Sequence, residues 1–372
     1  MKRLLITAAK RNLPVASKFV LICMVSLFFF ACQKEVVHPG TTIATNAITN
    51  SIKNFQVSES GVKLLQGNEN MNALYLRWEA GTLNTSGTFT IEAALSGANF
   101  TDIIELGTTD QKNITLTVKD FNRQMCRLIP TGATRTIELR IKAVIGKEVP
   151  AYSNAVALRV TTYQHFTEYN MAQIMYIPGN FQNWDVASAP RIITAENNGE
   201  YEGYVNFTNT YAQFLLVKSE KWDPVKTYTY IGAGKFGFGG SVFSIFGGAG
   251  IYLMKANTNT NTWNYTKINT WGINGTAVSA KGTTDHEMSY DAVTKTWNIQ
   301  LDLVKGDFRI RANNTNAISY GNTVKDGYSV PDNKGENFII EKAGHYNISL
   351  NLTLAGNYTC NLIKTVNPTG TD

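Results

Sequence analysis

The sequence has few of the residues from which metal sites and disulfide frameworks are built. Histidine occurs four times in 372 residues, and the copies are scattered without metal-ligand spacing. They are His38, His165, His286 and His345. Cysteine also occurs four times, and only Cys126 and Cys360 lie beyond the N-terminal region, far apart. We therefore expect no metal site, no cofactor and no disulfide framework.

Acidic residues are absent before Cys32. Five basic residues are spread over residues 2–18, and an apolar run of about 12 residues follows from Phe19 to Phe30. Such a run fits a signal peptide and is shorter than the roughly 20 residues of a membrane-spanning helix. Ala31 directly before Cys32 resembles a lipobox, in which the thiol is acylated and becomes the new N-terminus. We predict a lipoprotein signal peptide over 1–31, with an ordinary signal peptide or an N-terminal membrane anchor as the alternative.

The positive charge of the chain is concentrated in this N-terminal segment. The chain has 34 Lys and Arg against 28 Asp and Glu, a net charge of +6. Five of the basic residues precede Cys32, which leaves 29 against 28 in the mature protein. The mature protein therefore lacks the excess of positive charge that favours nucleic-acid binding, and we expect no nucleic-acid partner.

Long amphipathic helices are also absent, and short alternating runs separated by Asn, Gly, Asp and Thr predict an all-β chain. Residues 32–50 are rich in Thr, Asn and Ala and predict a flexible tether. Residues 51–165 contain runs such as Leu74–Trp78 and predict an immunoglobulin-like or fibronectin-like sandwich. Trp78 alternates with the leucines of its strand, so we expect it in the core.

The remainder contains an internal repeat with a period of about 95 residues. It predicts two tandem β-sandwiches, over 170–268 and 269–365. Five pairs of segments carry the repeat: 174–179 with 270–275, 199–207 with 294–303, 214–219 with 308–313, 248–252 with 342–346, and 263–268 with 358–363.

At three segments the sequence resembles the SusE/SusF family of outer-membrane glycan-binding lipoproteins of Bacteroidetes. The segments are Met175–Asp185, Tyr201–Tyr204 and Met288–Thr294. The resemblance implies carbohydrate-binding-module-like sandwiches in the two repeats, and starch or a related polysaccharide as ligand. It also implies surface exposure, since Gln33-Lys34-Glu35 resembles a surface-export signal. The partners it implies are the outer-membrane lipid, a TonB-dependent transporter and a SusD-like lipoprotein.

Sugar rings stack on aromatic side chains, and their hydroxyls bond to polar groups. The first repeat offers Trp184 in a loop-like stretch, and Lys218 followed by Trp222 after a strand. By resemblance these three form a glycan site, to which Tyr228 or Tyr230 adds a second platform. The alternative is that each tryptophan packs against the edge of its sandwich.

The second repeat departs from this pattern. By resemblance its site residues are Arg311, Asn313 and Tyr320, but no tryptophan stands in the matching loops. We expect Trp271 and Trp297 in the core. The repeat either binds weakly, binds through Tyr320 alone, or serves as structure.

Residues 232–240 form a glycine-rich stretch. These residues do not match the phosphate-loop pattern, because Phe236 follows the lysine, and they predict a flexible loop with exposed phenylalanines.

No pair of carboxylates typical of a glycosidase stands out in the sequence, so we expect that the protein is not an enzyme. A structural or adhesion protein without its own glycan site remains the alternative function.

Overall fold

The computed structural model describes residues 52–80, 87–144, 150–278 and 285–365. Strands dominate these ranges, so the predicted all-β class is confirmed. The signal segment, Cys32 and the tether over 32–50 lie outside the described residues. None of the helices within those ranges is long and apolar enough to span a membrane.

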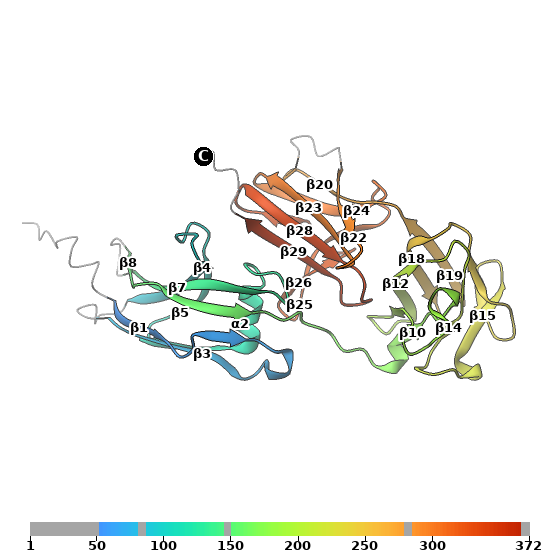
Figure 1. Ribbon diagram of the computed structural model, residues 1–372, viewed down its shortest axis with the longest axis horizontal. Helices are drawn as coiled ribbons and strands as arrows, with labels where there is room; N and C mark the ends of the chain where they lie inside the picture. The colour runs from blue at the N-terminus through green and yellow to red at the C-terminus, as the bar shows by residue number, and fades with distance from the viewer. Residues whose placement is uncertain (1–51, 81–86, 145–149, 279–284, 366–372) are drawn as a thin grey trace, which may run out of the picture. The chain divides into compact units, whose positions relative to one another are not determined.

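The N-terminal strands form two layers around one hydrophobic core (Figure 1). One sheet has the order β1-β3-β6, and the other has the order β2-β9-β7-β4-β5, with β8 paired to β7. The bounds are β1 Lys53–Val57, β2 Gly61–Lys63, β3 Asn72–Glu79, β4 Thr88–Leu95, β5 Ile104–Thr109, β6 Asn113–Thr117, β7 Thr134–Val144, β8 Ala151–Tyr152 and β9 Val156–Thr161.

Strand β3 shows why this sequence forms a sandwich. Leu74, Leu76 and Trp78 are buried and alternate with exposed residues, so one face of the strand packs on the core. The Trp78 ring lies edge-on to Phe89 at 5.4 Å. The prediction that Trp78 is a core residue is confirmed.

A short helix, α2 (Val118–Met125), interrupts the strands of this region. The Thr117 side chain caps it by accepting a hydrogen bond from the backbone N–H of Asp120. Its buried face includes Phe121 and Met125, which join the core between the sheets. The sequence pattern does not predict this helix, because eight residues are too few to show a clear helical period.

In the first repeat the strand pairing closes on itself. The path is β10-β11-β12-β18-β19-β16-β15-β14, and β13 pairs separately with β17. Single register pairs, Tyr176 with Val217 and Lys235 with Thr262, join the layers at their edges. The bounds are β10 Ile174–Tyr176, β11 Arg191–Ile193, β12 Glu200–Phe207, β13 Ala212–Phe214, β14 Leu216–Val217, β15 Thr227–Gly232, β16 Lys235–Gly237, β17 Phe243–Ile245, β18 Gly250–Asn257 and β19 Thr262–Ile268.

The Gly-rich stretch of this repeat differs from the expected loop. Residues Lys235–Gly237 form β16, which pairs with β15 as a hairpin. Phe236 is fully buried, whereas Phe238 is exposed. The prediction of a flexible loop with exposed phenylalanines is therefore wrong for Phe236, because strand alternation turns its ring into the core.

The second repeat keeps two separate sheets. One has the order β21-β20-β24-β25-β26 with β27 paired to β24, and the other has the order β22-β23-β28-β29. Trp271 and Trp297 are buried, as expected. The bounds are β20 Trp271–Asn274, β21 His286–Glu287, β22 Ser289–Asp291, β23 Thr296–Leu303, β24 Gly306–Ala312, β25 Ser319–Lys325, β26 Tyr328–Asp332, β27 Phe338–Ile340, β28 Gly344–Asn351 and β29 Thr359–Thr365.

Corresponding contacts recur in the two repeats. Phe214 stacks on Phe243 with ring centroids 5.0 Å apart, and Phe308 stacks on Phe338 at 5.0 Å. The Tyr252 hydroxyl donates to the carbonyl four residues earlier at 2.7 Å, and the Tyr346 hydroxyl does the same at 2.7 Å. These shared contacts support the internal repeat and fix which positions correspond.

Candidate functional site

The loop between β14 and β15 presents an exposed tryptophan on a braced backbone. Trp222 is 49% exposed. The backbone N–H of Lys218 donates to the carbonyl of Lys226 at 2.9 Å, which closes the base of the loop. Asp223 caps the short 3-10 helix Pro224–Lys226 by accepting from the N–H of Val225 at 3.1 Å. The Trp222 ring is thus exposed at a position that the loop itself defines.

Lys218 lies at the start of this loop with its amino group held near an aromatic face. Its Nζ lies 5.3 Å from the centroid of the Tyr201 ring. Tyr201 is buried, and its hydroxyl donates to the carbonyl of Ala172 at 2.8 Å. Among the described residues no carboxylate pairs with Lys218. Its three N–H donors can therefore face a neutral, hydroxyl-rich ligand.

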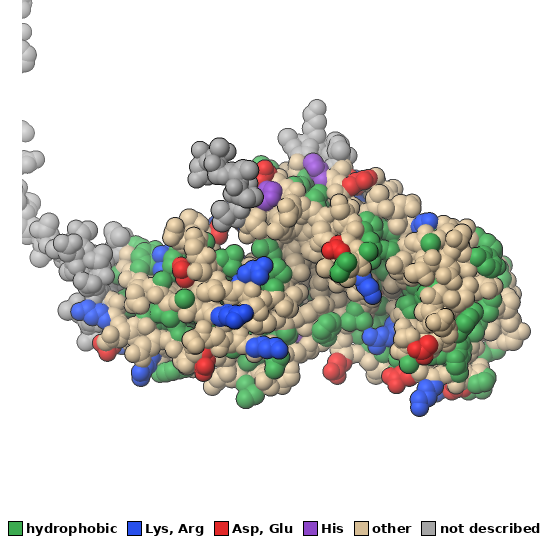
Figure 2. All heavy atoms as spheres, viewed as in Figure 1, with side chains coloured by type: hydrophobic (Ala, Val, Ile, Leu, Met, Phe, Trp, Pro, Cys, Tyr) green, Lys and Arg blue, Asp and Glu red, His purple; other side chains and the backbone are tan. Residues whose placement is uncertain are grey.

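Tyr228 follows the loop and lies between two phenylalanines. It pairs in register with Leu216 on β14. Its ring centroid lies 5.0 Å from those of Phe236 and Phe238. Phe238 is 60% exposed and extends the aromatic surface beyond Tyr228. Figure 2 shows hydrophobic side chains gathered around β15.

Tyr230, the other expected platform, faces the core. Its ring centroid lies 6.2 Å from Phe243 and 6.3 Å from Trp263. It packs against the core of the first repeat. Tyr228 packs against the same core, so what distinguishes it from Tyr230 is its contact with the exposed Phe238.

Trp184 lies in a different loop, which follows β10. Because β10 and β14 are antiparallel neighbours, the loops after them leave this pair at opposite ends. Trp184 is half-buried, and it and Asn183 both have positive φ, 59° and 61°. Such a backbone is uncommon for a bulky residue. No contact between described residues joins Trp184 to Lys218 or Trp222, so the structure does not assemble the expected trio.

Arg311 and Asn313 are occupied by contacts within the protein. Arg311 pairs with the nearly buried carboxylate of Asp285 and donates to Asn316 at 3.1 Å. Asn313 accepts from the backbone N–H of Asn269 at 2.8 Å and donates to the carbonyl of Lys267 at 2.8 Å. The bonds of Asn313 brace the connection between β19 and β20. Both side chains are thus engaged within the protein, and their part in glycan binding stays a prediction.

Tyr320 is 3% exposed and has no face open to a sugar. It stacks on Trp271 at 5.5 Å, and its hydroxyl lies 2.9 Å from the hydroxyl of Tyr204. Burial raises the pKa of Tyr320 far above its usual range. Tyr204 of the first repeat thus covers most of Tyr320, and glycan binding by Tyr320 stays a prediction.

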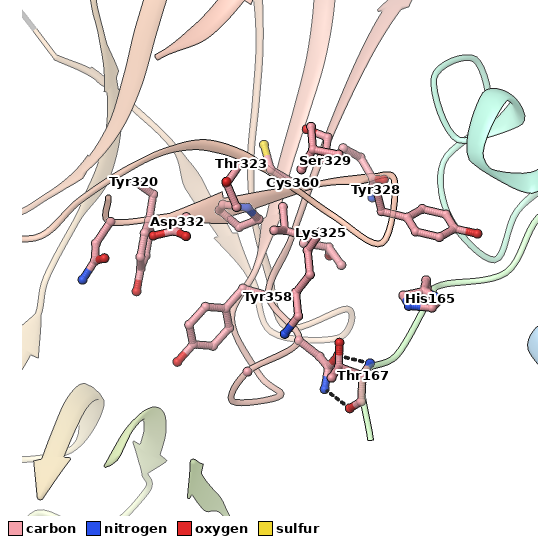
Figure 3. A pocket seen from close by; sticks show the side chains of 18 of the residues that line it. His165, Thr167, Tyr320, Thr323, Lys325, Tyr328, Ser329, Asp332, Tyr358 and Cys360 are labelled. Carbon is pink, nitrogen blue, oxygen red and sulfur yellow. Dashed lines mark hydrogen bonds between the residues drawn. The ribbon is translucent and has the colours of Figure 1, made fainter. Parts of the chain in front are cut away.

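A cavity of about 1350 Å³ lies beside β25, β26 and β29. Figure 3 shows two hydrogen bonds at Thr167, with Lys325 pointing toward them. The Thr167 N–H donates to Asn357 at 2.6 Å, and Asn357 donates back to the Thr167 carbonyl at 3.0 Å. Lys325 donates to the Tyr169 hydroxyl at 3.1 Å. These polar groups bond to one another, and Tyr320 and Tyr358 on the cavity wall are buried.

Thiols and metal-ligating groups form no reactive cluster in the described part of the chain. Cys126 and Cys360 are free, and burial raises the pKa of each to about 12, so both stay protonated at neutral pH. Within the same residues no group of three His, Cys, Asp or Glu side chains could hold a metal ion.

The strand pairing defines the class of the protein: an all-β chain of two-layered modules, in which the strand pairing of the first repeat closes on itself and several aromatic side chains of that repeat are exposed. Residues 42–142 match the family model described as SusE outer membrane protein. The match takes in β1 to β6 and most of β7 of the N-terminal sandwich, and it supports the resemblance to the SusE/SusF family and the expected outer-membrane localisation.

Among solved structures, the crystal structure of SusF from Bacteroides thetaiotaomicron matches with 10% sequence identity and a TM-score of 0.25. That match covers 84% of this chain and 77% of the other. No curated protein matches the chain.

Proposed function

We propose that the chain is a non-catalytic surface lipoprotein that binds starch or a related neutral polysaccharide through Lys218, Trp222 and Tyr228. The observation that carries this proposal is the exposed Trp222 ring on a braced loop that begins at Lys218, a lysine with no carboxylate partner among the described residues. The match to the SusE family model supports a Sus-type surface role.

The contacts available predict weak binding at one site. A sugar ring stacked on Trp222 contributes about 1 kcal/mol beyond the burial of its area. A hydrogen bond from the charged Lys218 contributes about 1.5–3 kcal/mol. After the cost of ordering the glycan, these contacts predict a single-site Kd between micromolar and millimolar.

In the proposed arrangement, acylated Cys32 holds the chain at the membrane and residues 32–50 act as a tether. A surface covered with such chains gains retention through effective concentration. The proposed partners are a TonB-dependent transporter and a SusD-like lipoprotein, which would take over the captured polysaccharide.

The test is affinity electrophoresis of the mature chain in gels containing different glycans. We expect retention on soluble starch or a related neutral glucan, and a loss of about tenfold in affinity for Trp222→Ala, equivalent to about 1.4 kcal/mol. Val225→Ala, an exposed change in the same loop, is the control and should leave retention unchanged. If the wild type is retained on no glycan, the structural or adhesion role replaces this proposal.

Hydrolysis is a second candidate because carboxylates line the cavity, among them Glu202 and Asp332. Burial raises the pKa of Glu202, while Lys255 at 3.7 Å opposes that rise. Asp332 also lines the cavity, and a glycosidase needs two such groups, one of them with a raised pKa. We expect no release of reducing sugar from soluble starch. Release that Glu202→Gln abolishes would establish hydrolysis instead.

A further inference from the structure

Two exposed aromatic rings meet at the end of the β13–β17 pair. Tyr211 directly precedes β13 and Phe246 directly follows β17, so they are cross-strand neighbours beyond the pair Ala212 and Ile245. Their ring centroids are 5.7 Å apart with the planes tilted by 56°. Tyr211 is 50% exposed and Phe246 is 76% exposed. Buried aromatic pairs are ordinary, but a paired and exposed one calls for an explanation.

The ring pair stands on a rigid base. Behind it, Phe214 stacks on Phe243 in the core. Asn180 donates to the carbonyl of Tyr211 at 3.0 Å and accepts from the N–H of Gln213 at 3.0 Å. These bonds tie the start of the Trp184 loop to this edge. The two rings are therefore held in place before any ligand arrives.

The backbone after Phe246 is fixed as well. Lys267 donates to the carbonyl of Gly247 at 2.7 Å, and the Tyr252 hydroxyl donates to the carbonyl of Gly248 at 2.7 Å. A side chain at Gly247 would collide with that hydroxyl, so only glycine fits. This hydrogen bond holds the amino group of Lys267 at the carbonyl of Gly247, the residue that follows Phe246.

The two chain segments that carry the pair contain no charged residue. Residues 207–217 and 236–254, which contain both strands, include no Asp, Glu, Lys or Arg. The polar groups beside the rings are hydroxyls and amides, such as Ser244, whose Oγ lies 3.2 Å from the Tyr211 hydroxyl. This chemistry suits a neutral sugar, which offers C–H faces to rings and hydroxyls to polar groups.

The second repeat has a different pair at the corresponding positions. Phe308 and Phe338 match Phe214 and Phe243, which places Lys305 and Glu341 where the first repeat has Tyr211 and Phe246. Both charged residues are exposed. The fold therefore does not require aromatic residues there, and packing does not account for them.

A second copy of the chain fits this surface less well than a glycan does. Two aromatic side chains bury about 150–250 Å² each when fully covered. That area is well below the roughly 1,000 Å² that a stable protein interface needs. A sugar chain that covers one or two rings needs no more surface than the pair offers.

We propose that Tyr211 and Phe246 form a second binding surface for a neutral glycan on the first repeat, separate from Lys218, Trp222 and Tyr228. This inference rests on the proposed function. Tyr211 and Lys218 are seven residues apart along β13 and β14, so their Cα atoms lie at most about 23 Å apart. One polysaccharide chain can therefore reach both surfaces and gain from effective concentration.

The experiment compares short and long ligands on the mature chain. Isothermal titration with maltotriose should give two sites per chain for the wild type, and one for the double variant Tyr211→Ala with Phe246→Ala. Retention of that variant in soluble-starch gels should fall about tenfold. Lys305→Ala with Glu341→Ala, at the corresponding positions of the second repeat, is the matched control and should change neither value.

The outcomes separate this inference from the proposed function. Unchanged stoichiometry and retention in the double variant, with loss in Trp222→Ala, overturn the second surface and leave the first. Loss in the double variant, with Trp222→Ala unaffected, supports the second surface and removes the first. Absence of binding by the wild type overturns both. A change in oligomeric state on gel filtration, without a change in retention, overturns the glycan surface in favour of self-association.

Discussion

The two repeats pair corresponding strands in the same register, but they differ in whether the aromatic residue at one end of the sandwich is covered. Tyr228 and Tyr320 hold the same register position, opposite Leu216 and Ile310 respectively. In the first repeat Tyr228 lies next to the exposed Phe238. In the second, Tyr320 is covered by Trp271 and by Tyr204 from the first repeat. The difference teaches that one sandwich end can serve as a ligand surface or as a packing surface.

The largest effect is expected for Trp271→Ala, which tests whether the second repeat shares a hydrophobic core with the first. Trp271 is fully buried and shares a core with Tyr204, Leu253 and Ile268 of the first repeat. Trp271→Ala should lower the free energy of unfolding by about 3–5 kcal/mol. Chemical denaturation followed by circular dichroism measures it. A loss below about 1 kcal/mol would contradict the shared core.

Arg311→Ala should have the next largest effect. It leaves the nearly buried Asp285 carboxylate without its cation, at a cost of about 2–3 kcal/mol once residual solvent access is considered. Starch retention at a temperature where the variant is folded should stay at the wild-type level. A selective loss of retention without loss of stability would restore Arg311 as a binding residue.

Tyr320→Phe isolates the hydroxyl contact between the repeats. It removes the 2.9 Å contact with Tyr204 and should cost about 1 kcal/mol in stability. Because the ring is buried, glycan retention should not change. Tyr228→Phe, at the matching register position, is the companion variant. Weaker retention for Tyr320→Phe than for wild type would argue for a site on the second repeat.

The smallest effect concerns the half-buried Cys360 thiol. Cys360 occupies the register position that Trp263 holds in the first repeat, opposite Leu350 instead of Ala256. Burial raises the pKa of Cys360 from 9.0 to about 12. As pH rises, the Cys360 thiol of the unfolded chain therefore loses its proton at a lower pH than the thiol of the folded chain. Its contribution to the free energy of unfolding falls as pH rises above about 9. Iodoacetamide should label Cys360 much more slowly in the native chain than in guanidinium at pH 8; equal rates would place the thiol at the surface.

Local patterns in the sequence predicted much of the fold. Period-two alternation identified β3 and the buried Trp78, and the turn and strand signals revealed the internal repeat. Helix α2 and strand β16 were missed, because each is too short to stand out from its surroundings. For the candidate site, the exposure of Trp222 was foreseen, whereas the Tyr211–Phe246 pair was not. A possible signal for that pair was the uncharged stretch 236–254 with its phenylalanines.

The sequence by itself determined the strand faces and the residue types available to each module, since alternation and side-chain chemistry are local properties. Only the tertiary structure decided which aromatic rings remain open. Tyr320 and Tyr204 are 116 residues apart in the chain, and their contact turns an expected platform into core. Likewise, the pairing of β10 with β14 separates the loops of Trp184 and Trp222. Such long-range contacts arise from how modules and strands pack, and no local pattern encodes them.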